Sequence, residues 1–442
     1  MNISNSHRRL FFFVLVLAML CLSEFVRAQG EGPAILTIKQ RAEIFDHWLR
    51  IRLEKVLPEI MRRENIDMWI VICREYNEDP VYLTLVPSTS MSARRLSMLV
   101  FYDRGQESME RVTVSRYGIG DLYKSIWDPN KTEQWARLAE VIKERKPKRI
   151  GIDESNTFAF GDGLSASHKA KLTEALGPEY AKRLVSAERL AVGWLEKRTP
   201  EELEVYPHLV AIAHAIIADA FSSKVITPGA TTADDIVWWM RERIAELKLG
   251  TWFHPSISIQ RSKAGKIKED RVIHRGDLLH CDMGTSYLGL TTDTQEHAYV
   301  LRQGEEDAPK GLRDALAQGN RLQDIFLGEF QELRTGNQIL AAALKKAKDE
   351  GLKPSIYTHP LGFHGHAAGP TIGLWDKQDG VPGEGDYPLF FDTCFSIELN
   401  IRASVPEWDN QEVQIALEED AAFTRAGTFF IDGRQTKLYL IK

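Results

Sequence analysis

Cysteine is scarce in this chain of 442 residues, which contains only Cys21, Cys73, Cys281 and Cys394. The four are far apart in the sequence and include no C-x-x-C pair, so they predict neither a disulfide framework nor a cysteine-based zinc site. Internal repeats and low-complexity segments are also absent. A hydrophobic fraction of 43% with 27% charged residues is ordinary for a globular enzyme. We therefore expect a folded protein that is stabilised by its hydrophobic core.

Long hydrophobic runs are lacking after the first residues of the chain. The apolar run Leu10–Leu22 is shorter than the roughly 20 residues of a membrane-spanning helix. It follows the basic His7-Arg8-Arg9 and precedes Val26-Arg27-Ala28, where small residues occupy the positions that a signal peptidase reads. The sequence therefore predicts a signal peptide over residues 1–28. It predicts an exported protein, periplasmic or secreted, with no stable membrane anchor after cleavage behind Ala28.

An excess of positive charge is lacking as well. The chain has 56 Lys and Arg against 62 Asp and Glu, a formal net charge of −6. Cleavage of the signal peptide removes Arg8, Arg9, Arg27 and Glu24, which lowers the net charge by two, to −8. A mildly acidic exported protein is a poor candidate for binding nucleic acid or an anionic membrane. We expect no nucleic-acid partner.

The first part of the mature chain, residues 29–195, alternates between helical and strand patterns. We expect helices over residues 38–65 and 133–145, and strands over residues 66–74, 96–102, 111–115 and 149–153. The second helix is amphipathic, with Trp135, Leu138, Val141 and Ile142 on one stripe. This alternation predicts a compact α/β domain. We find no catalytic set of residues in it.

A domain boundary is predicted near Lys197, and residues 196–442 form the second part. Thr199-Pro200-Glu201-Glu202 is a strong helix start, with Thr as N-cap and Glu202 closing a capping box. Thr335 and Gln338 predict another capping box, with Gly351 as the helix stop. We expect four helices, over residues 199–227, 232–248, 309–333 and 335–350, and strands over residues 256–260, 278–300, 395–401 and 413–424. Paired helices with strands gathered between them predict an α+β fold.

Two carboxylates, Asp282 and Asp293, stand eleven residues apart on a predicted hairpin that could bring them face to face. Such a pair is rare without a cation, because close carboxylates repel and shift each other's pKa. Residues 357–366 add three histidines: His359, His364 and His366. Glu398 lies inside an apolar strand pattern, where a charge is costly unless it is paired or bound to metal. Glu418 lies at the edge of another such pattern.

These motifs, in this order, resemble the pita-bread metallopeptidases: methionine aminopeptidase, aminopeptidase P and prolidase. Arg275-Gly276-Asp277-Leu278 before Cys281-Asp282 is similar to the family's G-D-L-V-x-x-D strand, and the step to Asp293 is the family's step. His359-Pro360-Leu361-Gly362 resembles its H-x-[IL]-G motif. Ser396-Ile397-Glu398 resembles its T-I-E, although Leu399 replaces the usual proline, and Glu418-Glu419-Asp420 resembles its E-D-D. The resemblance covers about residues 195–442, and the part before it looks like the creatinase/prolidase N-terminal domain.

The resemblance implies two divalent cations, with Mn2+ as the first expectation and Zn2+, Co2+ or Fe2+ as other possibilities. Asp282 would hold the first cation, His359 and Glu398 the second, and Asp293 and Glu418 would bridge them. Two cations about 3.5–4 Å apart generate a hydroxide that attacks a scissile carbonyl. Glu398 would take the proton and His366 would contact the substrate. The implied function is a peptidase acting on Xaa-Pro bonds, of the aminopeptidase P or prolidase type, and a homodimer.

Several positions depart from the prolyl peptidases of the family. Gly265 and Ser355 stand where those enzymes carry histidines, which puts Xaa-Pro specificity in question. His254 and His274 are the nearest histidines that could compensate. His364 could exchange roles with His366 as a substrate contact. A creatinase-like, metal-free C–N hydrolase and a non-catalytic peptide-binding protein remain as alternatives.

His280 occupies a position at which the family usually has an apolar or amide residue. In a regular strand it points to the same face as Asp282, two residues on. We predict that His280 either supports a metal ligand or contacts metal itself. A core histidine with a backbone partner is the alternative.

Overall fold

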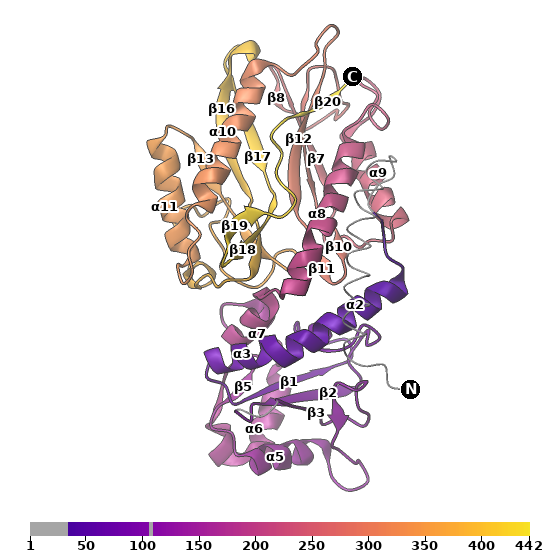
Figure 1. Ribbon diagram of the computed structural model, residues 1–442, viewed down its shortest axis with the longest axis vertical. Coiled ribbons are helices and arrows are strands. Elements are labelled where there is room, and N and C mark those ends of the chain that lie inside the picture. Colours follow the sequence, from indigo (N-terminus) through magenta and orange to yellow (C-terminus); the bar gives the residue numbers. More distant parts are fainter. Residues whose placement is uncertain (1–33, 106–108) are drawn as a thin grey trace.

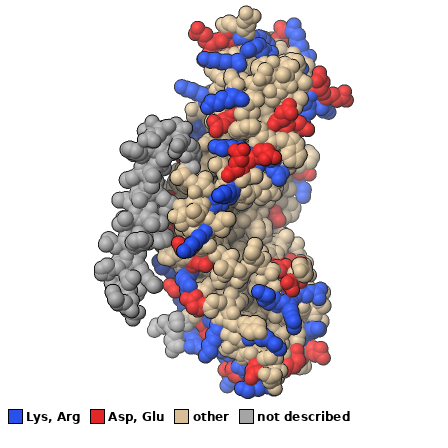
Figure 2. Space-filling view, turned by 90° about the vertical axis from the view of Figure 1, so that its right-hand side faces the viewer, with Lys and Arg blue, Asp and Glu red and all other residues tan. Residues whose placement is uncertain are grey.

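The computed structural model describes residues 34–105 and 109–442. The predicted signal peptide, residues 1–28, lies outside the described residues. Figure 1 shows two lobes, the lower one formed by the first part of the chain and the upper one by the remainder, which runs in colour from magenta through orange to yellow. Figure 2 shows acidic and basic side chains interspersed on the face that it displays, so neither sign dominates there.

The lower lobe is built on a mixed sheet in which every neighbour of the central strand β1 comes from a different part of the sequence. Among the described residues this sheet has six strands, in the order β4-β3-β2-β1-β5-β6. Their bounds are β1 Met68–Arg74, β2 Leu96–Tyr102, β3 Glu110–Thr113, β4 Lys124–Ser125, β5 Ile150–Ile152 and β6 Leu184–Ser186. β1 pairs antiparallel with β2 and parallel with β5. The strands predicted over residues 66–74, 96–102, 111–115 and 149–153 are confirmed.

Helices cover both faces of this sheet, because alternate residues of β1 point to opposite sides. Met68 and Ile70 pack with helices α5 (Gln134–Arg145) and α6 (Ala166–Ala181). Trp69 and Val71 pack with α2, α3 and α7 on the other face. The bounds are α2 Ile38–Ile51, the π-helical turn η1 Arg52–Val56, α3 Leu57–Arg63 and α7 Glu188–Glu196; α4 (Tyr82–Leu85) and η2 (Ala159–Gly161) are short.

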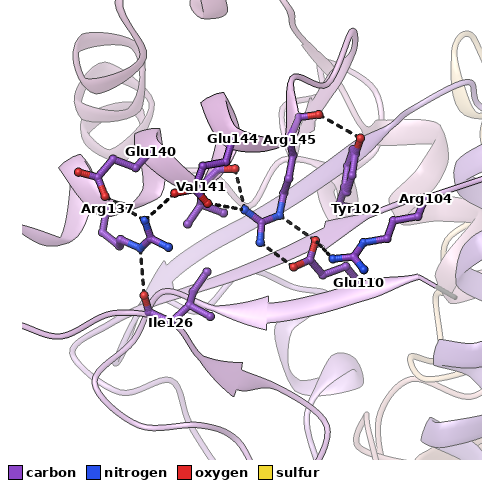
Figure 3. Close-up of polar contacts among 9 residues, drawn as sticks. All are labelled: Tyr102, Arg104, Glu110, Ile126, Arg137, Glu140, Val141, Glu144 and Arg145. Atoms are coloured by element: carbon purple, nitrogen blue, oxygen red, sulfur yellow. Dashed lines mark hydrogen bonds and ion pairs between the residues drawn. The ribbon is translucent and has the colours of Figure 1, made fainter. Parts of the chain in front are cut away.

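Arg145, the last residue of α5, connects this helix to strand β3 of the sheet (Figure 3). The guanidinium of Arg145 donates to both carboxylate oxygens of Glu110 on β3, at 2.8 and 2.6 Å. Glu110 also pairs with Arg104 at 3.0 Å, and the hydroxyl of Tyr102 donates to the carbonyl oxygen of Arg145 at 3.0 Å. These contacts connect α5, which its apolar stripe predicted, to the earlier strands β2 and β3.

The upper lobe contains three larger sheets. Within the described residues their strand orders are β20-β12-β9-β7-β8, β13-β16-β17 and β14-β15-β18-β19, and a small hairpin pairs β10 with β11. The bounds are β7 Ser256–Arg261, β8 Gly265–Lys266, β9 Leu278–Met283, β10 Ser286–Tyr287, β11 Leu290–Thr291, β12 Thr294–Val300, β13 Pro354–Ile356, β14 His359–Leu361, β15 Thr393–Ser396, β16 Leu399–Val405, β17 Gln411–Leu417, β18 Asp420–Thr424, β19 Gly427–Phe430 and β20 Tyr439–Ile441. Helices α8 (Pro200–Ala220) and α9 (Ala233–Glu246) pack on the first sheet. Helices α10 (Lys310–Leu327) and α11 (Gly336–Asp349) pack on the other two.

Local capping signals placed these helices correctly. Thr199 and Glu202 close the predicted capping box of α8, and Thr335 and Gln338 close that of α11. Gly351 has a φ of +81°, as a helix-stopping glycine requires. α8 is long and apolar enough to cross a membrane by length and composition, but its apolar residues pack in the core against the first sheet. The predicted α+β class is confirmed.

Some boundaries were predicted wrongly. The strand predicted over residues 395–401 is divided into β15 and β16, and the one over residues 413–424 into β17 and β18, because each segment passes from one sheet to another. Glu398 therefore lies at a break between strands and not inside one. The predicted helix 309–333 ends at Leu327, the predicted helix 38–65 contains the π-helical turn, and α6 and α7 were not predicted.

The two lobes meet at a buried cluster of charges. The guanidinium of Arg52, from η1, donates to both carboxylate oxygens of Glu202, from α8, at 3.2 and 3.0 Å. Arg198 lies 3.8 Å from the same carboxylate. All three side chains are buried, and burial lowers the pKa of Arg52 to about 10. The carboxylate of Glu202 is therefore the ion-pair partner of both guanidinium groups at this junction.

Candidate functional site

A tight hairpin brings the two predicted aspartates together. β9 and β12 pair antiparallel, with Asp282 opposite Gln295 and Met283 opposite Thr294, so Asp293 directly precedes β12. The β10–β11 turn between them contains Leu288 at φ +57° and Gly289 at φ +74°. Two consecutive positive φ values are typical of the primed turns that connect twisted strands. The hairpin predicted for this segment is confirmed.

The remaining predicted ligands come from the two strand breaks and from β14. The β15–β16 break carries Glu398, and the β17–β18 break carries Glu418. The breaks are held beside each other and beside β12, since the Ile397 N–H donates to the Glu419 carbonyl at 2.9 Å and the Gln295 N–H to the Glu418 carbonyl at 3.0 Å. Three sheets thus contribute side chains to one place.

We define the candidate metal centre as Asp282, Asp293, His359, Glu398 and Glu418. Ligand atoms of Asp293, His359 and Glu418 all lie within 4.8 Å of one another. The Nε2 atom of His359 is 3.4 Å from Asp293 Oδ2 and 3.4 Å from Glu418 Oε1. Its Nδ1 atom hydrogen-bonds the Pro360 carbonyl at 3.0 Å, which leaves Nε2 to face the carboxylates. This is the orientation of a histidine that binds metal.

Gln295 connects the acids of the centre. Its amide Nε2 donates to Glu398 Oε1 at 2.6 Å and to Glu418 Oε2 at 2.7 Å. Its Oε1 lies 2.8 Å from Nε2 of His280. His280 therefore contacts Gln295, and also Ser258 at 3.3 Å, and within the described residues it forms no hydrogen bond with the carboxylates of the centre. Nothing in the sequence singles out Gln295, because an amide next to a strand start is unremarkable.

The carboxylate of Glu418 lies close enough to the other three acids of the centre to raise their pKa values. Burial, and then the charge of Glu418, raise the pKa of Asp282 to about 8 and raise the pKa values of Asp293 and Glu398 well above their ordinary range. Burial lowers the pKa of His359, but its hydrogen bond to Glu418 and the charge of that residue raise it overall. Four carboxylates cannot all be charged here without a cation. Asp293 Oδ1 is buried and has no hydrogen-bond partner, so the donor set fits divalent cations.

His366 and Trp252 lie beside the centre. The ring of His366 is 4.5 Å from that of His359 and 5.0 Å from that of Trp252. Burial, and then the charge of His359, lower the pKa of His366 and keep its imidazole neutral. Gly365 permits this approach, because a Cβ there would lie 2.1 Å from the Trp252 ring. The side chain of His366 is exposed to solvent.

Two other predicted residues lie apart from the centre. His254 is exposed and contacts α9, with its Nδ1 3.1 Å from Arg241 and its ring 5.4 Å from that of Trp238. His364 stacks on Phe160 of the lower lobe, with ring centroids 4.6 Å apart. Burial lowers the pKa of His364, and its Nε2 atom is buried without a partner. His364 thus supports the contact between lobes.

A cavity of about 450 Å³ opens onto His359, His366 and Glu398. Phe158 and Phe160 of the lower lobe line its other side, although the sequence suggested no functional residue in that part of the chain. Segments more than 200 residues apart form this wall, so only the folded chain reveals it. The cavity therefore lies beside the centre and is lined by both lobes.

Residues 208–425 match the model of metallopeptidase family M24. This part of the chain is an M24 metallopeptidase domain. The M24 domain contains all five residues of the candidate metal centre. The predicted pita-bread family and the predicted enzyme class are therefore confirmed, while the exact domain boundaries stay predictions.

The likeness to solved structures extends beyond the M24 domain to most of the chain. The X-Pro aminopeptidase from Thermotoga maritima MSB8 is 16% identical, with 86% of this chain and 99% of that chain covered and a TM-score of 0.61. An Xaa-Pro dipeptidase from Bacillus anthracis is 17% identical, with 89% and 99% covered and a TM-score of 0.58. Dipeptidase PepE from Mycobacterium ulcerans is 17% identical, with 89% and 98% covered and a TM-score of 0.58. No curated protein matches the sequence. At these identities the likeness shows a shared fold.

Proposed function

We propose that this protein is an exported peptidase that uses two divalent cations to hydrolyse an amide bond near a peptide N-terminus, with Xaa-Pro as the preferred bond. The convergence of Asp293, His359 and Glu418 within 4.8 Å, inside an M24 domain, carries the proposal. Asp282 would hold the first cation, His359 and Glu398 the second, and Asp293 and Glu418 would bridge them. Mn2+ is the cation we expect first, since this oxygen-rich set suits it.

The chain's own residues supply the acid–base and binding steps. Bound at the centre, two cations would lower the pKa of a water toward roughly 7 and so provide the nucleophile for the scissile carbonyl. Glu398 would accept the proton, since its Oε1 is already oriented by Gln295 at 2.6 Å. The neutral imidazole of His366 would donate an N–H to the substrate carbonyl from the cavity wall.

The cavity favours the aminopeptidase type over the dipeptidase type. A dipeptidase must neutralise the free carboxylate of its substrate close to the scissile bond. None of the described residues that line this cavity is a Lys or an Arg. Phe158, Phe160 and Trp375 line it instead, and such aromatic walls suit a proline ring. The names of the similar structures, an X-Pro aminopeptidase and an Xaa-Pro dipeptidase, support proline as the preferred residue.

One observation favours a second candidate, a non-catalytic peptide-binding protein. Gly265 lies in the β7–β8 hairpin opposite Arg261, and Ser355 lies in β13. Neither residue has an imidazole where the prolyl peptidases of the family carry a histidine. The nearest histidines have other partners: His254 contacts α9, and His274 is exposed with its backbone N–H bonded to Asp277. Loss of these histidines would lower turnover without removing the cations.

Metal content and peptide hydrolysis together test the proposal. The mature protein should contain two cations per chain and hydrolyse Xaa-Pro tripeptides faster than Xaa-Pro dipeptides in the presence of Mn2+. Glu398→Gln should abolish turnover, while Glu412→Gln, on exposed β17 surface, should leave it unchanged. Two cations without turnover would favour the peptide-binding alternative. A protein that hydrolyses a C–N bond without metal would be the creatinase-like hydrolase.

Export and assembly need measurements of their own. Mass spectrometry of protein from the periplasm or medium should find a chain that begins at Gln29. Retention of residues 1–28 would contradict cleavage. Light scattering should give the mass of a homodimer, which is expected from the resemblance of the lower lobe to the creatinase/prolidase N-terminal domain.

A further inference from the structure

A second group of metal-ligand side chains lies behind the candidate metal centre. We define the rear cluster as His214, Glu296 and Glu419. Glu296 directly follows Gln295, which contacts the candidate metal centre, and Glu419 directly follows Glu418, which belongs to it. Gln295 and Glu418 are joined by an isolated β-bridge. Successive side chains of extended backbone point to opposite sides, so Glu296 and Glu419 face away from the centre and toward α8.

The rear cluster has the geometry of a cation site. One ligand atom from each of His214, Glu296 and Glu419 lies within 4.8 Å of the other two. The Nε2 atom of His214 is 3.0 Å from Glu419 Oε2. Glu296 is 4% and Glu419 0% exposed, so water cannot freely solvate their charges. Within the described part of the chain, no Lys or Arg forms an ion pair with either glutamate.

An independent feature is that each of the three side chains also has a hydrogen-bond partner outside the cluster. Asp432 Oδ2 lies 3.1 Å from His214 Nδ1, and although burial lowers the pKa of His214, its hydrogen bonds to Asp432 and Glu419 raise this pKa to about 11, so a cation at Nε2 would take the place of a proton. The Gln435 N–H donates to Glu419 Oε1 at 2.7 Å. The Tyr439 hydroxyl donates to Glu296 Oε2 at 3.1 Å. A carboxylate that orients a histidine in this way is the usual support of a protein metal site.

We propose that the rear cluster binds one divalent cation, zinc in the first instance, through His214 Nε2 and one oxygen each of Glu296 and Glu419. One imidazole and two carboxylates, with one open position, form a ligand set that zinc accepts. The site would link α8, β12 and the β17–β18 break, which are far apart in sequence. It would thereby fix the backbone that presents Gln295 and Glu418 to the candidate metal centre. It goes beyond the proposed peptidase function and does not depend on it.

The alternative is that the rear cluster binds no metal, and that His214 carries a proton on Nε2 and forms an ion pair with Glu419. That account satisfies the same distances. It predicts that the rear cluster takes up no zinc when the candidate metal centre has been removed. The two accounts therefore differ in the number of ions bound and not in the fold.

The test counts zinc in the mature full-length chain after chelation, reloading with Zn2+ and dialysis. Asp293→Asn/His359→Gln dismantles the candidate metal centre without touching the rear cluster, and this variant should retain one zinc per chain. Adding His214→Gln should remove that zinc. Adding His208→Gln instead should not, because His208 lies on the same helix but hydrogen-bonds the Ala34 carbonyl.

Anomalous diffraction at the zinc edge, on crystals of the Asp293→Asn/His359→Gln variant, should place the ion between His214, Glu296 and Glu419. An ion count of zero in this variant, or a zinc located elsewhere, would overturn the proposal. The count is independent of catalysis, so a protein without peptidase activity would still give a clear result. Since the decisive variant leaves the rear cluster intact, misfolding of the His214→Gln variant cannot obscure it.

Discussion

Gln295→Leu is the change that most directly tests how the candidate metal centre is organised. Leucine has a similar volume but lacks the amide that donates to Glu398 at 2.6 Å and to Glu418 at 2.7 Å. Gln295 is 4% exposed, so water cannot easily replace either hydrogen bond. We expect weaker metal binding, because the two carboxylates would lose the group that sets their orientation.

The expected loss of affinity is smaller than the strength of the two bonds. Hydrogen bonds to charged groups contribute about 1.5–3 kcal/mol each. Gln295 can make them in both the metal-free and the metal-bound protein, so most of that energy cancels in the binding equilibrium. What remains is the loss of orientation, for which outer partners of metal ligands are worth about 10–100-fold in affinity. This corresponds to about 1.4–2.8 kcal/mol.

Competition titration of Mn2+ against a fluorescent chelator measures this change directly. Gln260→Leu is the matched control, since Gln260 is a partly buried glutamine of the same sheet whose amide bonds the Gln414 backbone. The control should bind Mn2+ as the wild type does. Wild-type affinity in Gln295→Leu would refute the role assigned to the amide.

His280 should act only through Gln295. Burial lowers the pKa of His280 to about 4, so at neutral pH it is uncharged and its Nε2–H donates to Gln295 Oε1 at 2.8 Å. His280→Leu should therefore weaken metal binding less than Gln295→Leu, and the double variant should bind as Gln295→Leu does. Additive losses would instead indicate that His280 contacts metal itself.

Further predictions concern charge and stability. The pKa of Asp282 is raised to about 8 in the folded protein, so the protein stripped of metal by a chelator should melt at lower temperature as the pH rises from about 4 to 8. Excess Mn2+ should reverse this trend. Thermal melts at several pH values, with and without Mn2+, measure both effects. Glu202→Gln should destabilise the protein by about 3–5 kcal/mol in urea unfolding, since it leaves two buried guanidinium groups unpaired, and the exposed control Glu204→Gln should not. Burial, and then the charge of Asp79, raise the pKa of Asp153 well above its ordinary range, so Asp153→Asn should stabilise the protein at pH 8 but not at pH 4, and an equal effect at both would contradict this.

The sequence alone determined the features that depend on near neighbours in the chain. The capping boxes at Thr199 and Thr335 involve residues three positions apart, so they could be identified without the fold. The hairpin that joins Asp282 to Asp293 is also local. The motifs around His359, Glu398 and Glu418 identified the family because they preserve order and spacing, which a linear sequence records in full.

Only the tertiary structure decided the features that depend on which sheet a segment joins. The apolar runs around Glu398 and Glu418 look continuous, yet each one changes sheet at the glutamate, and the choice is made by partners far away in the chain. Gln295 is 103 residues from Glu398 and 123 from Glu418, so no local pattern could connect them. His254 and His364 lie near the motifs in sequence, and their contacts with α9 and Phe160 are likewise visible only in the folded chain. Residue type and spacing thus indicated the chemistry, while long-range packing determined which side chains meet.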